Sequence, residues 1–122
     1  MKVLCGIGGS DDSLRALDRS VERAAVADDD LTVLIVDNPD SERSSDDLVN
    51  RAEQAVSDAG IDANIRRIDG DPGSRLVDIA EAEGFDEIVI GGGQTSPMGK
   101  ITIGTIAEFV LLNAKTSVTL VR

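Results

Sequence analysis

The sequence predicts an α/β fold in which an open parallel sheet of five strands is covered by helices on both faces. Five short apolar runs alternate with four longer segments whose apolar residues recur at helical spacing. Glycine, proline and helix-capping residues separate the segments. Right-handed crossovers between parallel strands turn such an alternation into a sheet with helices on both sides. The 122 residues fit one domain, residues 1–122.

The five apolar runs are expected to be the strands of this sheet. They cover residues 2–7, 31–36, 63–68, 87–90 and 117–121. The run 31–36 (LTVLIV) is apolar throughout, which is typical of a central strand buried on both faces. The run 63–68 (ANIRRI) is more polar, so we expect it at an edge of the sheet.

The four helices are expected to begin after residues that can cap them. These are Ser10, Ser44 or Ser45, Asp71 and Gly104. Serine and aspartate side chains accept a hydrogen bond from a free N–H of the first turn, and Pro72 suits the first helical position. Gly60 and Gly84 are expected to end the second and third helices. The fourth helix, over residues 104–114, is expected to carry Ile106, Phe109, Val110 and Asn113 on one face.

The composition excludes several kinds of chemistry. The chain carries 23 acidic and 12 basic residues, a formal charge of −11, with one cysteine and no histidine. It therefore has no histidine-based triad, no histidine-containing or four-cysteine zinc site and no internal disulfide. Cys5 lies in the middle of a strand, where a buried and unreactive thiol is expected. We predict no catalytic residue and no metal-ligating cluster.

The charge also bears on location and partners. A net negative chain lacks the basic clusters that neutralise phosphates, so we expect no binding to nucleic acid. No apolar run approaches the ~18–20 residues of a transmembrane helix, which predicts a cytoplasmic protein without membrane contact. Abundant aspartate, little lysine and a core of small residues suggest adaptation to the saline cytoplasm of a halophile. The alternative is an ordinary acidic protein of a mesophile.

The strongest candidate binding site is a glycine-rich segment that follows the fourth strand. It reads GGGQTSPMGK from Gly91 to Lys100, its only cation, and leads to Gly104 and Thr105 at a helix start. Glycines let backbone N–H groups approach an anion, and a helix N-terminus adds partial positive charge. We expect a thirteen-residue loop over 91–103 with a phosphate held near its two ends. The alternative is a glycine turn that binds nothing.

Three well-known phosphate-binding motifs do not fit. A P-loop would need glycine where Gln94 stands and serine or threonine where Ile101 stands. The SGGxDS loop of ATP pyrophosphatases departs at Ile7 and Asp12, and a GxGxxG fingerprint departs at Asp11. A receiver-like magnesium pocket lacks the lysine that should end its fifth strand. Asp11 and Asp12 are better explained as charges that complement the helix dipole.

The chain resembles the universal stress protein (UspA-like) family over essentially its whole length. The resemblance rests on the order of elements, on the opening VLCGIGGSDDSLRAL and on the closing GGGQTSPMGKITIGTIAEFVL. The nucleotide motif of that family is G-x2-G-x9-G-[ST]. Gly91 matches its first glycine and Gly104-Thr105 its last pair, whereas Gln94 replaces the second glycine. Gly8 stands where nucleotide-binding members commonly carry aspartate. The resemblance implies a flavodoxin-like, Rossmann-like sheet of order 3-2-1-4-5.

The resemblance also implies a function. It implies a stress-response protein that binds an adenine nucleotide, ATP or AMP, with or without Mg²⁺. The nucleotide would bind at the carboxyl ends of the strands. The protein would be non-catalytic or a very slow ATPase. The implied contact residues are Ile7, Gly8, Gly9, Val36, Gly91, Gly92, Gly93, Gln94, Gly104, Thr105 and Ile106. A homodimer through residues 117–121 is implied as well, and it would cover an otherwise exposed edge strand. The alternative is a dimeric interaction module of the same fold that binds no nucleotide.

Overall fold

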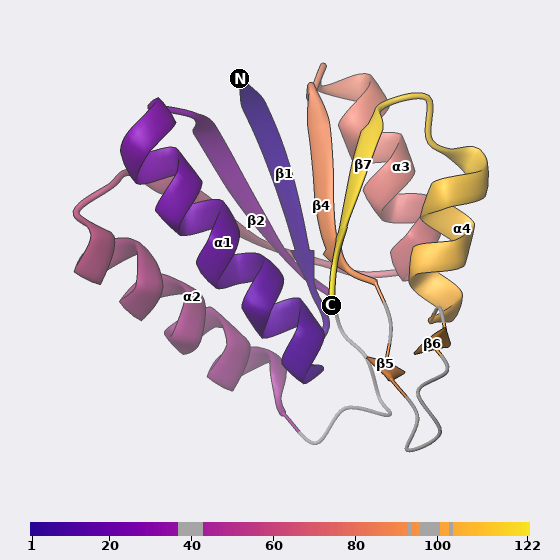
Figure 1. Ribbon diagram of the computed structural model, residues 1–122, viewed down its shortest axis with the longest axis horizontal. Helices are drawn as coiled ribbons and strands as arrows, with labels where there is room; N and C mark the ends of the chain where they lie inside the picture. Colours follow the sequence, from indigo (N-terminus) through magenta and orange to yellow (C-terminus); the bar gives the residue numbers. More distant parts are fainter. Residues whose placement is uncertain (37–42, 93, 96–100, 103) are drawn as a thin grey trace.

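The computed structural model describes residues 1–36, 43–92, 94–95, 101–102 and 104–122. Its main sheet is parallel, in the order β3-β2-β1-β4-β7 (Figure 1). The strands are β1 (Lys2–Ile7), β2 (Asp30–Val36), β3 (Ala63–Ile68), β4 (Glu87–Gly91) and β7 (Ser117–Val121). With β7 counted as the fifth strand, the predicted order 3-2-1-4-5 is confirmed, and β3 is an edge as expected.

The helices pack in pairs on the two faces of the sheet. They are α1 (Asp11–Ala27) and α2 (Ser45–Ala59) on one face, and α3 (Pro72–Ala82) and α4 (Thr105–Asn113) on the other (Figure 1). Because β1 leads into α1 on one face and β4 leads into α4 on the opposite face, the chain changes sides between these two neighbouring strands. This is the point at which the strand order reverses.

Side chains cap the starts of three helices as predicted. The oxygen of Ser10 accepts from the Ser13 amide at 3.3 Å, and that of Ser44 accepts from the Asp47 amide at 3.1 Å. Asp71 accepts from the Ser74 amide at 3.0 Å, and this hydrogen bond lowers the pKa of the Asp71 carboxyl. These caps satisfy N–H groups that have no partner within their own helix.

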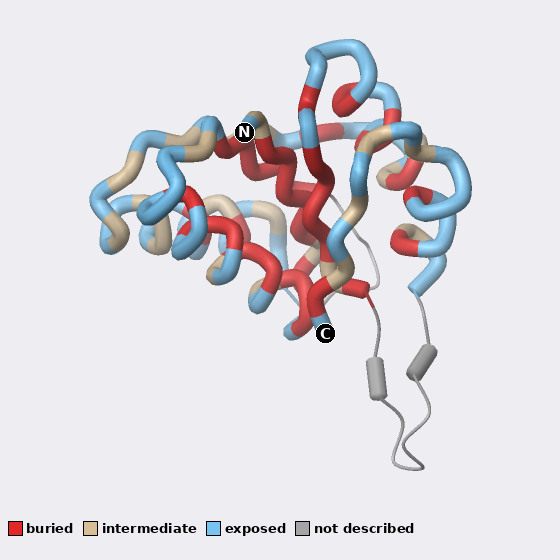
Figure 2. Tube along the Cα trace, turned by 45° about the horizontal axis from the view of Figure 1, so that its top comes forward, coloured by how far each residue is buried: buried red, intermediate tan, exposed pale blue. Residues whose placement is uncertain are grey.

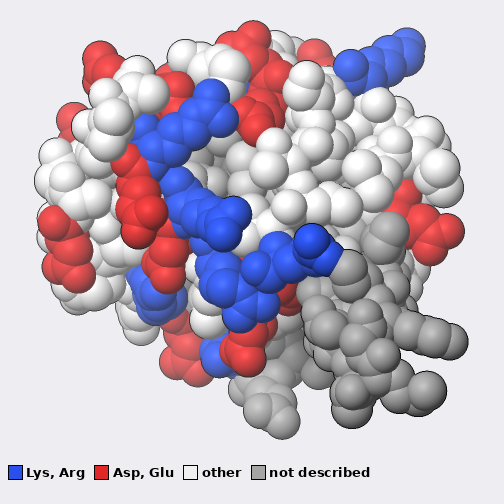
Figure 3. All heavy atoms as spheres, viewed as in Figure 1, with Lys and Arg blue, Asp and Glu red and all other residues white. Residues whose placement is uncertain are grey.

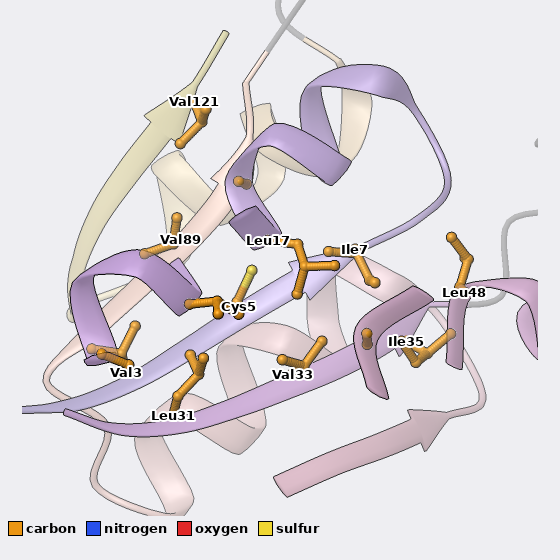
Figure 4. Packing of buried hydrophobic residues seen from close by; sticks show 14 residues of the cluster. Val3, Cys5, Ile7, Leu17, Leu31, Val33, Ile35, Leu48, Val89 and Val121 are labelled. Carbon is orange, nitrogen blue, oxygen red and sulfur yellow. The ribbon is translucent and has the colours of Figure 1, made fainter. Parts of the chain in front are cut away.

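The core consists of two apolar layers, one on each face of the sheet. Figure 2 shows the buried residues concentrated along the central strands and the inner sides of the helices. The layer beneath α1 and α2 contains alternate strand residues, and Figure 4 shows their close packing. They include Val3, Cys5, Ile7, Leu31, Val33 and Ile35. The other layer joins the opposite faces of the same strands to α3 and α4. Burial on both faces is why β1 and β2, after Lys2 and Asp30, carry Thr32 as their one polar side chain.

One expectation is corrected by the structure, and a second is refined. The predicted 91–103 loop contains a short antiparallel hairpin of β5 (Gln94–Thr95) and β6 (Ile101–Thr102), and Gly91 belongs to β4. In α4 the buried residues are Ala107 and Val110, Ile106 is half-buried, and Phe109 is 37% exposed. The face that was expected to carry Ile106, Phe109, Val110 and Asn113 is thus buried only in part, because α4 is apolar on nearly every side and its periodicity marks no single buried face. Among the described residues, no helix is long and apolar enough to cross a membrane.

Candidate functional site

The candidate site lies at the carboxyl ends of β1 and β4. The starts of α1 and α4 lie at this same end of the sheet, in the lower part of Figure 1. Ligands of open α/β sheets bind outside the carboxyl ends of the strands where the strand order reverses. Here this position falls between the β1–α1 turn and the segment that joins β4 to α4.

The β1–α1 turn is held in place by its own hydrogen bonds. Gly9 has a positive φ of 96° and donates its N–H to the Ser13 hydroxyl at 3.2 Å. That hydroxyl donates in turn to the Ser10 carbonyl at 2.8 Å. Gly9 is buried and Gly8 is half-buried, so Gly8 presents more of its main chain to the surface of the site.

Arg43 adds a cation that the sequence analysis did not identify. Its guanidinium donates to the Gly9 carbonyl and forms an ion pair with Asp11 at 3.1 Å. It is thus attached to the β1–α1 turn although 34 residues of sequence separate it from Gly9. The available signal was its position: it is the one basic residue between the end of β2 and the middle of α2, and the carboxyl end of β2 lies at the same edge of the sheet.

The end of β4 packs against the first turn of α1. A Cβ added at Gly91 would lie 2.5 Å from the Ser13 nitrogen and 2.8 Å from the Asp12 carbonyl carbon. Gly92 is buried and donates its N–H to the Val121 carbonyl at 2.9 Å. The missing side chain of Gly91 therefore allows the backbones of β4 and α1 to approach closely. This first glycine of the glycine-rich segment thus has a structural role.

The start of α4 differs from the other three helix starts because no side chain caps it. Gly104 occupies the N-cap position with extended backbone angles (φ −67°, ψ 156°), and a Cβ added there would meet nothing within 4 Å. The first carboxylate of the helix is Glu108, one turn in. The amides at this start are accordingly available to an anion, with the positive end of the helix dipole behind them.

The remaining predicted residues differ in burial and do not all present their side chains to the site. The side chains of Ile7 and Val36 are buried in opposite layers of the core, so only their main-chain atoms can line a site at the strand ends. Thr105 is exposed at the start of α4, and Ile106 packs partly against the layer beneath α3 and α4. Gln94 belongs to β5, opposite Thr102 in β6. Gly93 and Lys100 lie outside the described residues.

The described side chains offer no accessible thiol and no metal-ligating cluster. The Cys5 thiol is fully buried, and burial raises its pKa to about 12, so it stays protonated at neutral pH. Within the described ranges, no group of three or more histidine, cysteine, aspartate or glutamate side chains is placed to hold a metal ion. The arrangement suits an anionic ligand held by backbone amides.

Comparisons with known proteins agree with this architecture. A model of the universal stress protein family matches residues 1–122. A universal stress protein from Archaeoglobus fulgidus is 22% identical with a TM-score of 0.78, and the alignment covers 100% of this chain and 98% of that one. A universal stress protein solved in complex with cAMP is 27% identical with a TM-score of 0.77, covering 100% and 96%. An Arabidopsis thaliana member with AMP bound is 17% identical with a TM-score of 0.73, covering 99% and 90%. No curated protein matches the sequence.

Proposed function

Because the chain belongs to the universal stress protein family, we propose that it binds an adenine nucleotide at the carboxyl ends of β1 and β4 and serves in a stress response. The observation that carries the proposal is the uncapped start of α4. Gly104 provides no side-chain acceptor for the first-turn amides, whereas Ser10, Ser44 and Asp71 provide one at the other helices. A phosphate would accept from these amides.

The distribution of charge supports one orientation of the nucleotide. Asp11 and Asp12 occupy the first turn of α1, and their carboxylates would repel a phosphate there. The start of α4 carries no carboxylate before Glu108. The phosphates therefore lie toward Gly91, Gly92 and the Gly104–Ile106 start of α4, with Gly93 and Gln94 in the intervening segment.

The adenosine part then lies toward the β1–α1 turn and the end of β2. The main chains of Ile7, Gly8, Gly9 and Val36 border it, and Arg43 contributes a positive charge beside Gly9. Gly8 offers no carboxylate to the ribose. The 27%-identical universal stress protein solved in complex with cAMP supports an adenine ligand. We propose AMP or ATP as the ligand, with or without Mg²⁺, and no catalytic turnover beyond very slow ATP hydrolysis.

We also propose a homodimer in the cytoplasm, joined through β7. This strand pairs only with β4 in the described sheet, so its outer edge presents unpaired backbone groups. Leu111 and Leu112 are exposed on the neighbouring α4, Leu112 by 77%, and would be covered in part by a second copy.

We further propose that the protein is adapted to high salt, as in a halophilic archaeon. The formal charge of −11 makes the folded chain repel itself, and salt screens that repulsion. We expect the melting temperature to be higher in about 2 M than in about 0.1 M KCl. A melting temperature that stayed the same or fell would contradict this proposal.

The nucleotide proposal is tested by thermal shift and calorimetric titration with AMP, and with ATP plus Mg²⁺. Ligand at about a hundredfold its Kd stabilises the fold by about 2.7 kcal/mol, which is a rise of several degrees in Tm. Guanosine monophosphate is the control ligand for the base. An unmoved Tm at saturating AMP and ATP, with salt held constant, would leave the non-nucleotide interaction module as the better explanation.

A variant pair tests the role of the start of α4. Thr105→Pro removes one amide donor, yet proline suits the first helical position, and the extended Gly104 is compatible with a following proline. Thr105→Ala removes only the hydroxyl. We expect Thr105→Pro to weaken nucleotide binding about tenfold or more, since hydrogen bonds to charged groups contribute about 1.5–3 kcal/mol, and Thr105→Ala to weaken it less.

A further inference from the structure

A line of arginines crosses the exposed side of α1. Arg15, Arg19 and Arg23 follow one another at four-residue spacing, and all three are exposed. Arg122 directly follows β7, whose end accepts a hydrogen bond from Gly92, the residue after Gly91 at the first turn of α1. Figure 3 shows a nearly continuous blue line over α1 that extends toward the C-terminus. We call these four residues the arginine stripe.

The stripe is unusual because acidic residues are in excess. With 23 carboxylate side chains for 12 basic ones, most described arginines away from α1 have an acidic partner. These pairs are Arg43–Asp11, Arg51–Asp18, Arg66–Glu83 and Arg67–Asp46. In the stripe only Arg23 is paired, with Asp29 and Glu87. Arg15, Arg19 and Arg122 have no ion pair within the described part of the chain.

An uncovered strand face lies beside the stripe. Val121 packs in the layer beneath α1, so Ser117 and Thr119, at alternate positions of β7, face the same side of the sheet. Both are exposed, and no described helix covers them. The Thr119 hydroxyl donates to the Glu87 carboxylate. The arginine stripe thus borders a polar strand surface that an extended chain can follow.

We propose that the arginine stripe and this face of β7 bind an extended acidic segment of a partner polypeptide. Arginines four residues apart on a helix are separated by about 6 Å along its axis. Alternate residues of an extended chain are about 6.6–6.8 Å apart, so carboxylates at alternate positions match that spacing. Guanidinium and carboxylate groups pair through two parallel hydrogen bonds. A nucleic acid fits less well, because its phosphates continue past the stripe and meet the carboxylates of a chain whose net charge is −11.

The test measures fluorescence anisotropy at low ionic strength with a labelled peptide of about eight residues that carries glutamate at alternate positions. A glutamine version is the control peptide. The Arg15→Gln/Arg19→Gln double variant removes two unpaired arginines of the stripe. The control variant Arg75→Gln removes one exposed arginine of α3 that likewise has no ion pair among the described residues. Binding of oligothymidylate and the oligomeric mass of each variant in solution are measured as well.

We expect the wild type to prefer the glutamate peptide. The double variant should weaken its binding about tenfold, and Arg75→Gln should change it less than about twofold. Four outcomes would overturn the proposal: no preference over the glutamine peptide, an equal loss in Arg75→Gln, tighter binding of oligothymidylate through the same arginines, or a changed oligomeric mass in the double variant. The last two would assign the stripe to nucleic acid or to contact between copies.

Discussion

Replacing Gly91 with alanine is expected to destabilise the fold by about 3 kcal/mol, at the upper end of the range for overpacked substitutions. The new Cβ would lie 2.5 Å from the Ser13 nitrogen and 2.9 Å from its Cα. These are backbone atoms at the start of α1, so no side-chain rotation relieves the clash. The first turn of α1 must move away from β4, or β4 must shift within the sheet.

Urea unfolding and thermal melting measure this loss. At about 4 °C per kcal/mol, Tm should fall by about 12 °C. Gly104→Ala is the matched control, because a Cβ there meets nothing within 4 Å and its φ of −67° suits any residue. It should cost no more than about 0.5–1 kcal/mol. Equal stability of the two variants would contradict the close approach of β4 and α1.

Alkaline pH is expected to destabilise the protein through Cys5. Burial raises the thiol pKa from 9.0 to about 12. Below pH 9 the thiol is protonated in both states, so it adds no pH dependence. Between pH 9 and about 12 the unfolded chain loses this proton while the folded chain keeps it. The unfolded state then binds fewer protons, and stability falls with a slope of up to about 1.4 kcal/mol per pH unit.

Urea unfolding of the wild type and Cys5→Ala between about pH 8 and 11 isolates this effect. The chain has no tyrosine, so no phenol titrates in this range, and the lysines are common to both proteins. We expect Cys5→Ala to start less stable, because it leaves a small cavity, but to lose less stability as the pH rises. Parallel profiles would mean that the thiol is accessible to solvent in the folded protein.

Much of the fold could be predicted because local signals and the overall fold agree. The apolar runs of β1 and β2 indicated central strands, and Ser10, Ser44 and Asp71 marked helix starts that the structure confirms. The buried face of α4 could not be predicted, since apolar residues surround that helix and tertiary contacts select Ala107 and Val110. The hairpin of β5 and β6 was missed because glycine-rich sequence usually indicates a loop.

The candidate site could be predicted only in part. Spacing predicted that Gly91 and Gly104 mark the two ends of a phosphate-binding segment, and this stays a prediction; it did not indicate that Gly91 permits close contact with α1. Arg43 reaches Gly9 from a distant part of the sequence, and such contacts depend on how β2 and α2 are placed. The arginines of α1 were visible at helical spacing, yet only the structure shows which of them lack acidic partners.

Binding of AMP at the start of α4 is tested most directly by an amide chemical-shift titration of the ¹⁵N-labelled protein. We expect saturable shifts that are largest for Thr105 and Ile106, with smaller ones at Gly92, Gly8 and Gly9, and weakened saturation in Thr105→Pro. The absence of saturable shifts, or shifts confined to the arginines of α1, would contradict a nucleotide site between β1 and β4.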